Sequence, residues 1–212
     1  IPFECISRAD RLDEEVVDAL ADIGCRRLWI GSESGSQRVL DAMKRKARVV
    51  DVQAKTHMLQ QRGIEVGMFI MLGYEGEQQS DLQATVDHLK KASPDIFLTT
   101  VAYPIKGTPY YEEVQSRLLS NQPWEQSTDR DLGVRDRHSA RYYDHATRWM
   151  VNEVNLHKAR RTGTANFFQR AKMALNARRG RLGMRLTRHD RETAANGSGR
   201  GWDAADRAAQ GW

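Results

Sequence analysis

The amino-acid sequence predicts an α/β fold: a parallel-stranded sheet or part of a (βα) barrel, followed by a helical C-terminal extension. Strand-like and helix-like segments alternate over residues 1–115, as in folds built from βαβ units. No turn dipeptide joins neighbouring strand segments, although an antiparallel hairpin protein would need them. Because right-handed crossovers place every post-strand loop on one edge of a sheet, a ligand site is expected at that edge.

Four strands are expected from the placement of the apolar residues. The clearest is a continuous apolar run at 66–72, which is typical of a strand buried on both of its faces. The first strand begins at Pro2, in a position where strands tolerate proline. The expected strands are residues 2–8, 25–31, 66–72 and 96–103.

Helices are expected between and after these strands. The first is indicated by acids in its opening turn, apolar residues at helical spacing, and Gly24 just past its end. The second is predicted to use Ser36 as its N-cap and to run to about Lys46. Further helices are expected at residues 50–62, 80–91, 139–161 and 165–178, with another start signal at Thr108-Pro109.

Composition indicates that part of the chain lies outside a packed core, since the mean hydropathy is −0.68 and 40% of the residues are hydrophobic. We expect three parts: a C-terminal piece of a barrel at 1–115, a connector and helical extension at 116–180, and a basic, disordered tail at 181–212. The chain begins on a strand-like segment, which suggests a fragment of a longer protein. It carries no signal peptide and no apolar run that could span a bilayer, so we expect a cytoplasmic protein without a membrane partner.

The net charge of +5 conceals an asymmetry along the chain. Between Lys158 and Arg191 there are eleven lysines or arginines and one acid, a net charge of +10 that leaves about −5 for the remainder. Such a segment is suited to nucleic acid or an acidic partner. A solvated basic extension explains the same pattern, so the sequence leaves both interpretations open.

Three post-strand loops carry residue types suited to a ligand. Gly31–Gln37 combines glycines with a helix start, although it lacks the Lys-Ser/Thr pair of a nucleotide-triphosphate loop, and a tight turn with a capping serine explains it as well. Residues 67–77 end in glycines and two carboxylates, Glu75 and Glu77, of which one is expected to point inward. Residues 103–111 contain proline and glycine. They either form a stiff segment of a binding rim or simply end one element and begin the next.

Taken in order, these segments resemble the radical S-adenosylmethionine (SAM) enzymes, most closely the branch with cobalamin-binding, methylthiotransferase-like and elongator-like members. The resemblance covers roughly residues 1–115. It departs mildly from the family pattern, with Tyr-Glu-Gly-Glu where proline usually follows the glycine and Pro-Ile-Lys-Gly-Thr where Pro-x-Pro-Gly-Thr is common. The matching text is Arg8-Ala-Asp10, residues 24–40, residues 67–77 and Pro104-Ile-Lys-Gly-Thr-Pro109.

This resemblance implies a partial TIM-like barrel that binds SAM beside a [4Fe–4S] cluster and cleaves it reductively to a 5′-deoxyadenosyl radical. It also implies a reductant such as flavodoxin or ferredoxin, and it is compatible with cobalamin held by an upstream domain. By position it places Gly31, Glu33, Ser34 and Gly35 near the ribose or amino-acid portion of SAM, Ile70, Gly73 and Glu77 beside the adenine, and the Tyr103 backbone at the adenine rim.

The chain lacks the Cys-x-x-x-Cys-x-x-Cys loop with which this family holds its cluster. Cys5 and Cys25 fall on two different expected strands and are expected to be packing residues. His138 and His145 lie ~10 Å apart along one helix, too far to share a metal ion. We therefore expect no metal ligands, and an enzyme only as part of a longer chain; the catalytic residues and the substrate are not predicted.

Two other functions remain open at this point. A cluster-free barrel fragment could bind a phosphate or a nucleotide derivative through the Gly31–Ser36 turn. Alternatively, the basic segment could serve as a nucleic-acid-binding appendage.

Overall fold

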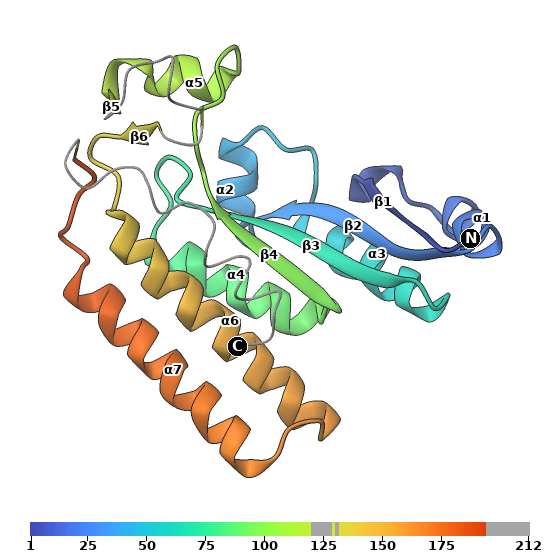
Figure 1. Cartoon of the computed structure of the whole chain (residues 1–212). Helices are drawn as coiled ribbons and strands as arrows, with labels where there is room; N and C mark the ends of the chain where they lie inside the picture. The colour runs from blue at the N-terminus through green and yellow to red at the C-terminus, as the bar shows by residue number, and fades with distance from the viewer. Residues whose placement is uncertain (120–128, 130–131, 194–212) are drawn as a thin grey trace. The chain divides into compact units, whose positions relative to one another are not determined.

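The computed structural model describes residues 1–119, 129 and 132–193 (Figure 1). The chain divides into two compact units. The first unit comprises Ile1–Thr100 and His157–Thr164, and the second comprises Val101–Leu156 and Ala165–Trp212. The expected boundary between barrel and extension, at residue 115, stays a prediction.

The first unit is built on a four-stranded sheet with the order β1-β2-β3-β4. Strands β1 and β2, and strands β2 and β3, pair in parallel, so the chain must cross over between them. This confirms the expected parallel α/β architecture, and each strand begins and ends within two residues of its expected bounds. The strands are β1 (Phe3–Ser7), β2 (Cys25–Glu33), β3 (Glu65–Leu72) and β4 (Ile96–Val101).

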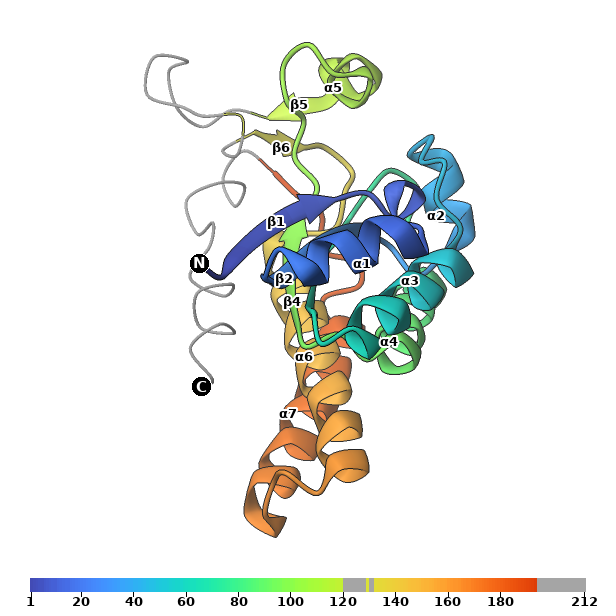
Figure 2. The ribbon, with the colours of Figure 1, turned by 90° about the vertical axis from the view of Figure 1, so that its right-hand side faces the viewer.

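Helices α1, α3 and α4 lie on one face of this sheet (Figure 2). Local signals begin and end them as expected: the Asp13 side chain accepts a hydrogen bond from the Val16 amide at 2.9 Å, and Gly24, with φ of 85°, follows α1. The helices of this unit are α1 (Glu14–Asp22), α2 (Gln37–Ala42), α3 (Val49–Gln61) and α4 (Gln79–Ala92), with a 3-10 turn η1 at Ala9–Arg11.

Helix α2 is shorter than the expected helix from Ser36 to Lys46. Ser36 is its N-cap residue, but the Ser36 hydroxyl makes no capping bond and instead donates to Asp81 Oδ1 at 2.6 Å. The helix ends at Ala42, and Lys44 then adopts a left-handed conformation with φ of 55°, which an α-helix cannot continue.

The strands have a helix-covered face and an opposite face, which we call the open face. Along β2, Leu28 and Ile30 are fully buried beneath the helices, whereas Trp29 points the other way. Trp29 stacks on Phe69 of β3 with ring centroids 5.0 Å apart, and its ring also lies against Gly67, where it leaves no room for a side chain. An aromatic pair thus occupies the middle of the open face.

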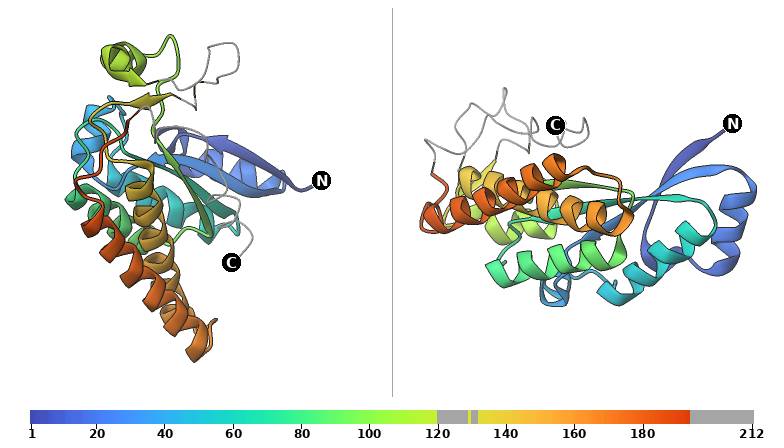
Figure 3. Two further views of the ribbon diagram at one scale, coloured as in Figure 1. Left: turned by 60° about the vertical axis from the view of Figure 1, so that its left-hand side comes forward. Right: turned by 90° about the horizontal axis from the view of Figure 1, so that it is seen from below.

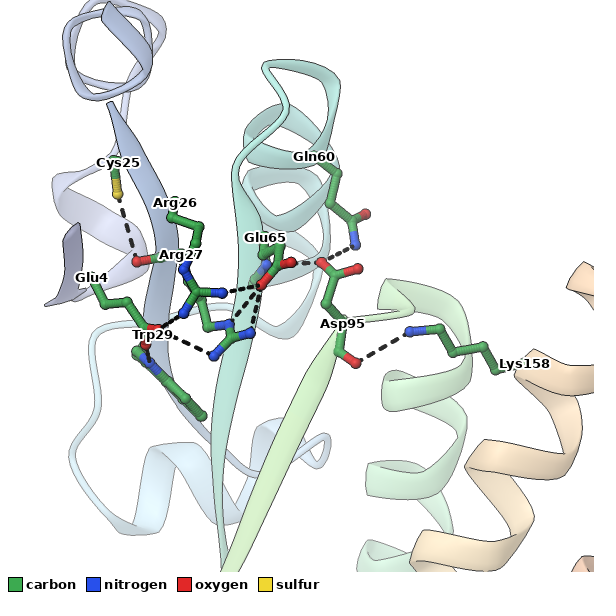
Figure 4. A network of polar contacts seen from close by, with 10 residues as sticks. Glu4, Cys25, Arg26, Arg27, Trp29, Gln60, Glu65, Asp95 and Lys158 are labelled. Atoms are coloured by element: carbon green, nitrogen blue, oxygen red, sulfur yellow. Dashed lines mark hydrogen bonds and ion pairs between the residues drawn. The ribbon is translucent and has the colours of Figure 1, made fainter. Parts of the chain in front are cut away.

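Charged side chains join three strands at their amino-terminal ends (Figure 4). Glu4 of β1 accepts a hydrogen bond from Trp29 Nε1 at 2.9 Å and pairs with Arg26. Arg27 Nε donates to Glu65 of β3 at 2.9 Å. Because these groups are partly exposed and screened by water, the ion pairs add little to stability, and the network mainly fixes strand register.

The second unit contains short strands, helix α7 and the part of helix α6 that precedes His157. Thr108 caps α5 by accepting a hydrogen bond from the Tyr111 amide at 3.3 Å, which confirms the predicted helix start. Of the expected connector, residues 120–128 and 130–131 lie outside the described part. The elements are α5 (Pro109–Val114), η2 (Gln115–Arg117), β5 (Leu118–Leu119), β6 (Gly133–Val134), α6 (Ala140–Thr162) and α7 (Phe167–Leu186), with β5 and β6 antiparallel.

Helices α6 and α7 run side by side in opposite directions (Figures 1 and 3). Helix α7 continues to Leu186, so the expectation that it ends at Arg178 and gives way to a disordered tail at 181 is wrong for residues 181–186. Two glycines within it let the helices approach closely: a Cβ on Gly180 would lie 2.6 Å from the Trp149 amide nitrogen of α6. The disorder expected from about Thr193 falls almost wholly outside the described residues.

Within the described residues, no helix combines the length and apolar character that crossing a membrane requires.

Candidate functional site

Strand β2 ends in a bulge that sets the position of Glu33. Gly31 pairs with Phe69 and Glu33 with Ile70, so Ser32 is an extra residue in the ladder. Glu33 adopts φ of 59°, a left-handed conformation that costs a non-glycine residue roughly 1 kcal/mol. Its carboxylate folds back over Gly31, where a Cβ would meet Glu33 Oε1 at 3.3 Å. The bulge thus places a carboxylate at the carboxyl end of β2.

The Glu33 carboxylate is largely withdrawn from solvent, with its side chain 13% exposed. Burial raises its pKa, and the opposing effect comes from Arg45, whose Nη2 lies 2.9 Å from Glu33 Oε1. A carboxylate with one cationic partner keeps further lone pairs for a ligand's hydroxyl or ammonium group. It is therefore suited to bind the polar part of a small molecule.

A buried histidine supports this bulge from the helix-covered face. His88 of α4 lies 3.1 Å from Gln53 Nε2 through Nδ1 and 2.9 Å from Ser32 Oγ through Nε2. Because the Gln53 amide nitrogen donates, His88 Nδ1 accepts, and Nε2 carries the proton toward Ser32. Burial lowers the pKa of His88 to about 4, with Lys91 adding to the effect, so the ring is neutral at pH 7.

The rest of the Gly31–Ser36 turn is fixed against α4. Ser34 Oγ lies 3.2 Å from Thr85 Oγ1, and the Gly35 amide donates to the same hydroxyl at 2.9 Å. Gly35 sits so close to α4 that a Cβ would lie 2.5 Å from Thr85 Cα. Ser34 and Gly35, both expected near SAM, therefore face the helix, and their contacts hold the turn in place.

This arrangement disfavours the phosphate-binding interpretation of the turn. The amides of Ser34, Gly35 and Ser36 already donate to Ser32 O, Thr85 Oγ1 and Ser34 Oγ. Backbone amides that are bonded within the protein are not available to cradle a phosphate. The helix that follows, α2, is also only six residues long.

The second loop contributes another buried carboxylate. Glu77 Oε2 accepts a hydrogen bond from the Gly73 amide at 2.6 Å, whereas Glu77 Oε1 is buried without a partner. Burial raises the pKa of Glu77 to about 7, against the hydrogen bond from Gly73, which lowers it. The buried oxygen without a partner is an acceptor that a ligand's N–H or O–H group could satisfy.

Arg38 of α2 joins the two loops. Its Nη2 donates to the Gly76 carbonyl at 2.9 Å and pairs with Asp81 at the start of α4. Asp81 also accepts from the Gln78 amide at 2.8 Å. These contacts bring the Gly31–Ser36 and Gly73–Gln78 turns to the same edge of the sheet, as the parallel topology predicts.

The other two expected ligand residues are Ile70 and Tyr103. Ile70 is 1% exposed and belongs to the helix-covered face, so its side chain does not reach the open face. The residues on either side of it, Phe69 and Met71, alternate onto the open face instead. Tyr103 follows β4 and belongs to the second unit.

Sequence reasoning missed four polar residues that hold the site: Arg38, Arg45, Asp81 and His88. Asp81 had a readable signal, because it forms a capping box with Gln78 at the start of α4. The other three act through contacts between elements that are distant in the sequence. Their roles appear only once the sheet and helices are assembled.

The cysteines do not form a cluster site. Cys5 Sγ and Cys25 Sγ lie 3.8 Å apart on neighbouring strands, and burial raises the pKa of Cys25 to about 11. A [4Fe–4S] cluster with one open iron needs three thiolates, so these two residues do not fit it. The His138 ring stacks on the Tyr142 ring, with the ring centroids 4.0 Å apart. Within the described ranges, no three His, Cys, Asp or Glu side chains are grouped as metal ligands.

Comparison with known proteins gives one family. The sequence model of the Radical SAM superfamily matches residues 1–89. An uncharacterised methyltransferase of Pyrococcus horikoshii is 26% identical over 140 residues, which cover 65% of this chain and 30% of that protein. A tRNA-2-methylthio-N(6)-dimethylallyladenosine synthase of Corynebacterium jeikeium is 33% identical over 103 residues, covering 47% of this chain and 20% of that one. The chain thus spans less than a third of these relatives.

A similar fold occurs in the radical SAM methyltransferase TsrM of Kitasatospora setae, solved with cobalamin and a [4Fe–4S] cluster bound. The alignment has a TM-score of 0.51 and 20% sequence identity, and it covers 58% of this chain and 26% of TsrM. This match concerns the fold alone, and it agrees with the parallel α/β sheet described above.

Proposed function

We propose that this chain, whose residues 1–89 match the sequence model of the Radical SAM superfamily, is part of a radical SAM enzyme and supplies part of its SAM-binding rim. Members of the superfamily use SAM together with a [4Fe–4S] cluster. In the complete enzyme the cluster would supply the electron for reductive cleavage of SAM to methionine and a 5′-deoxyadenosyl radical. The present chain has no cysteine set for a cluster, so its residues bind and orient SAM.

The observation that best supports this proposal is the Glu33 carboxylate at the end of β2. It is buried, held by a left-handed backbone conformation, and paired with a single arginine. In that state it can accept hydrogen bonds from the ribose hydroxyls or the ammonium group of SAM. Gly31 lies beneath this carboxylate, and a side chain at position 31 would fill the space that the carboxylate occupies.

The second loop and the open face complete the proposed rim. The Gly73–Glu77 turn would border the adenine, with the buried Glu77 Oε1 able to accept an N–H group. Met71 and Phe69 supply apolar surface on the same face, in the place that the sequence assigned to Ile70. Tyr103 remains a proposed backbone contact to the adenine rim, and Ser34 and Gly35 position the turn.

Other parts of the proposal follow from the family. Cluster ligands would come from residues outside this chain, an electron donor such as flavodoxin or ferredoxin would supply the electron, and a cobalamin domain is compatible with the TsrM-like fold. Expression of the complete gene product, anaerobic reconstitution with iron and sulfide, and an assay for 5′-deoxyadenosine from SAM test this activity. A fully reconstituted protein that forms no 5′-deoxyadenosine would overturn it.

Glu33→Gln is expected to weaken SAM binding by roughly tenfold or more, because the amide loses charge-assisted hydrogen bonds to the ligand. Equilibrium dialysis with SAM, on the reconstituted complete protein, measures the effect. Glu65→Gln is the matched control, because it removes a carboxylate from the same sheet but at the amino-terminal end of a strand. This variant should bind SAM with unchanged affinity. Equal affinities of the Glu33→Gln variant and the unsubstituted protein would remove Glu33 from the SAM site.

A further inference from the structure

Helix α7 carries large apolar side chains on its outer surface. Phe168, Leu175 and Leu182 recur every seven residues, and Leu186 follows one turn later, so all four lie on one side of the helix. Their exposed fractions are 81%, 49%, 56% and 74%. We call these four residues the apolar stripe.

The packing of α7 on α6 explains why these residues face outward. The buried side of α7 is made of small residues, Ala177, Gly180 and Gly183, together with Met184. A Cβ on Gly180 would lie 2.6 Å from the Trp149 nitrogen and 2.8 Å from the His145 carbonyl. Because the two helices are this close, the side that faces α6 has no space for phenylalanine or leucine.

Basic residues border the apolar stripe on both sides. Helix α7 contains six lysines or arginines and no acid. At 100° per residue, Arg178 and Arg185 fall on one side of the stripe, and Lys172 and Arg179 fall on the other. The outer surface of α7 is therefore an apolar strip between two positively charged margins.

We propose that α7 docks on an anionic lipid surface, with the apolar stripe entering the boundary between headgroups and acyl chains. Phosphate groups of the lipids would pair with the flanking arginines and Lys172. This contact does not need a membrane-spanning helix, which the described residues lack, because an interfacial helix lies in the plane of the surface. The proposal differs from the expectation, drawn from the sequence, that the chain has no membrane partner.

Charge and polarity favour this partner over the alternatives. A second copy of α7 would bring two positively charged margins together, which disfavours a symmetric helix pair. Nucleic acid would satisfy the arginines but would leave Phe168 and the three leucines exposed to water. An anionic lipid surface offers both an apolar phase and phosphates, so it matches the whole outer surface of the helix.

Co-sedimentation of the full chain with vesicles tests the proposal. We expect binding to vesicles of phosphatidylglycerol mixed equally with phosphatidylcholine, weaker binding as salt rises, and little binding to phosphatidylcholine alone. Leu175→Asn with Leu182→Asn should lower the partition coefficient by roughly tenfold or more. Arg178→Gln with Arg185→Gln should lower it by about tenfold.

Two variants serve as controls for these changes. Ile23→Asn alters an apolar residue of the first unit that is at least as exposed as the two leucines, and Arg48→Gln alters an exposed arginine there. Both variants should bind vesicles like the unsubstituted chain. Circular dichroism verifies that each variant is folded. Absence of vesicle binding at low salt overturns the proposal. Vesicle binding that the Leu175 and Leu182 substitutions leave unchanged also overturns it. The same holds if the chain binds tRNA but not vesicles and the arginine substitutions weaken the tRNA binding.

Discussion

Gly35→Ala is expected to destabilise the first unit by about 3 kcal/mol, near the upper end for an overpacked core. A Cβ there would lie 2.5 Å from Thr85 Cα and 2.6 Å from the Ala84 carbonyl oxygen. Both are backbone atoms of α4, so no side-chain rotation can relieve the contact. The helix and the Gly31–Ser36 turn would have to separate.

Urea unfolding measures this effect, and Gly63→Ala provides the matched control. Gly63 has φ of 75° and no atom within 4 Å of an added Cβ, so alanine there costs about 1 kcal/mol of backbone strain without any overlap. Gly35→Ala should therefore be clearly the more destabilising of the two. If the two variants unfold at the same urea concentration, close packing does not require a glycine at position 35.

The same substitution connects packing to the proposed site. Separation of the turn from α4 would break the Gly35 and Ser34 contacts to Thr85 and loosen the bulge that holds Glu33. We therefore expect Gly35→Ala to weaken SAM binding more than a substitution that leaves the Gly31–Ser36 turn in place.

Much of the first unit was predictable because its signals are local. The apolar run of β3, the acids at the start of α1 and the glycines at 24 and 63 each fix an element boundary from neighbouring residues alone. Right-handed crossovers then place the first two loops on one edge, and Arg38 links those loops in the structure.

Features that depend on distant contacts could not be read from the sequence. The continuous apolar run of β3 gives no alternation, so the sequence does not indicate which face of the sheet the Ile70 side chain occupies. The bulge at Ser32 and the left-handed Glu33 have no sequence signature, because glutamate rarely adopts that conformation. In α7, close packing on α6 requires glycine at position 180, and no local signal in the sequence indicates that contact.

Buried Glu77 and His88 should give the first unit opposite dependences of stability on pH. Glu77 has a folded-state pKa of about 7 against an ordinary value of 4.5, so the folded state holds its proton more tightly and stability falls as pH rises between these values. His88 has a folded-state pKa of about 4 against 6.5, so the unfolded state holds the proton more tightly and stability rises over that interval. Each effect amounts to about 3 kcal/mol.

Since the two intervals overlap, their contributions largely cancel between pH 4.5 and 6.5, and single substitutions should separate them. Relative to the unsubstituted chain, Glu77→Gln should gain about 3 kcal/mol of unfolding free energy between pH 4.5 and pH 8, because the glutamine carries no charge to bury. The unsubstituted chain gains stability between about pH 4 and pH 7 as His88 becomes neutral. His88→Gln lacks this gain, so its stability relative to the unsubstituted chain should fall by a similar amount over that range. Urea unfolding across this range measures both differences. Parallel stability–pH curves for a variant and the unsubstituted chain would show that the substituted residue titrates alike in the folded and unfolded states, which contradicts the burial of that side chain.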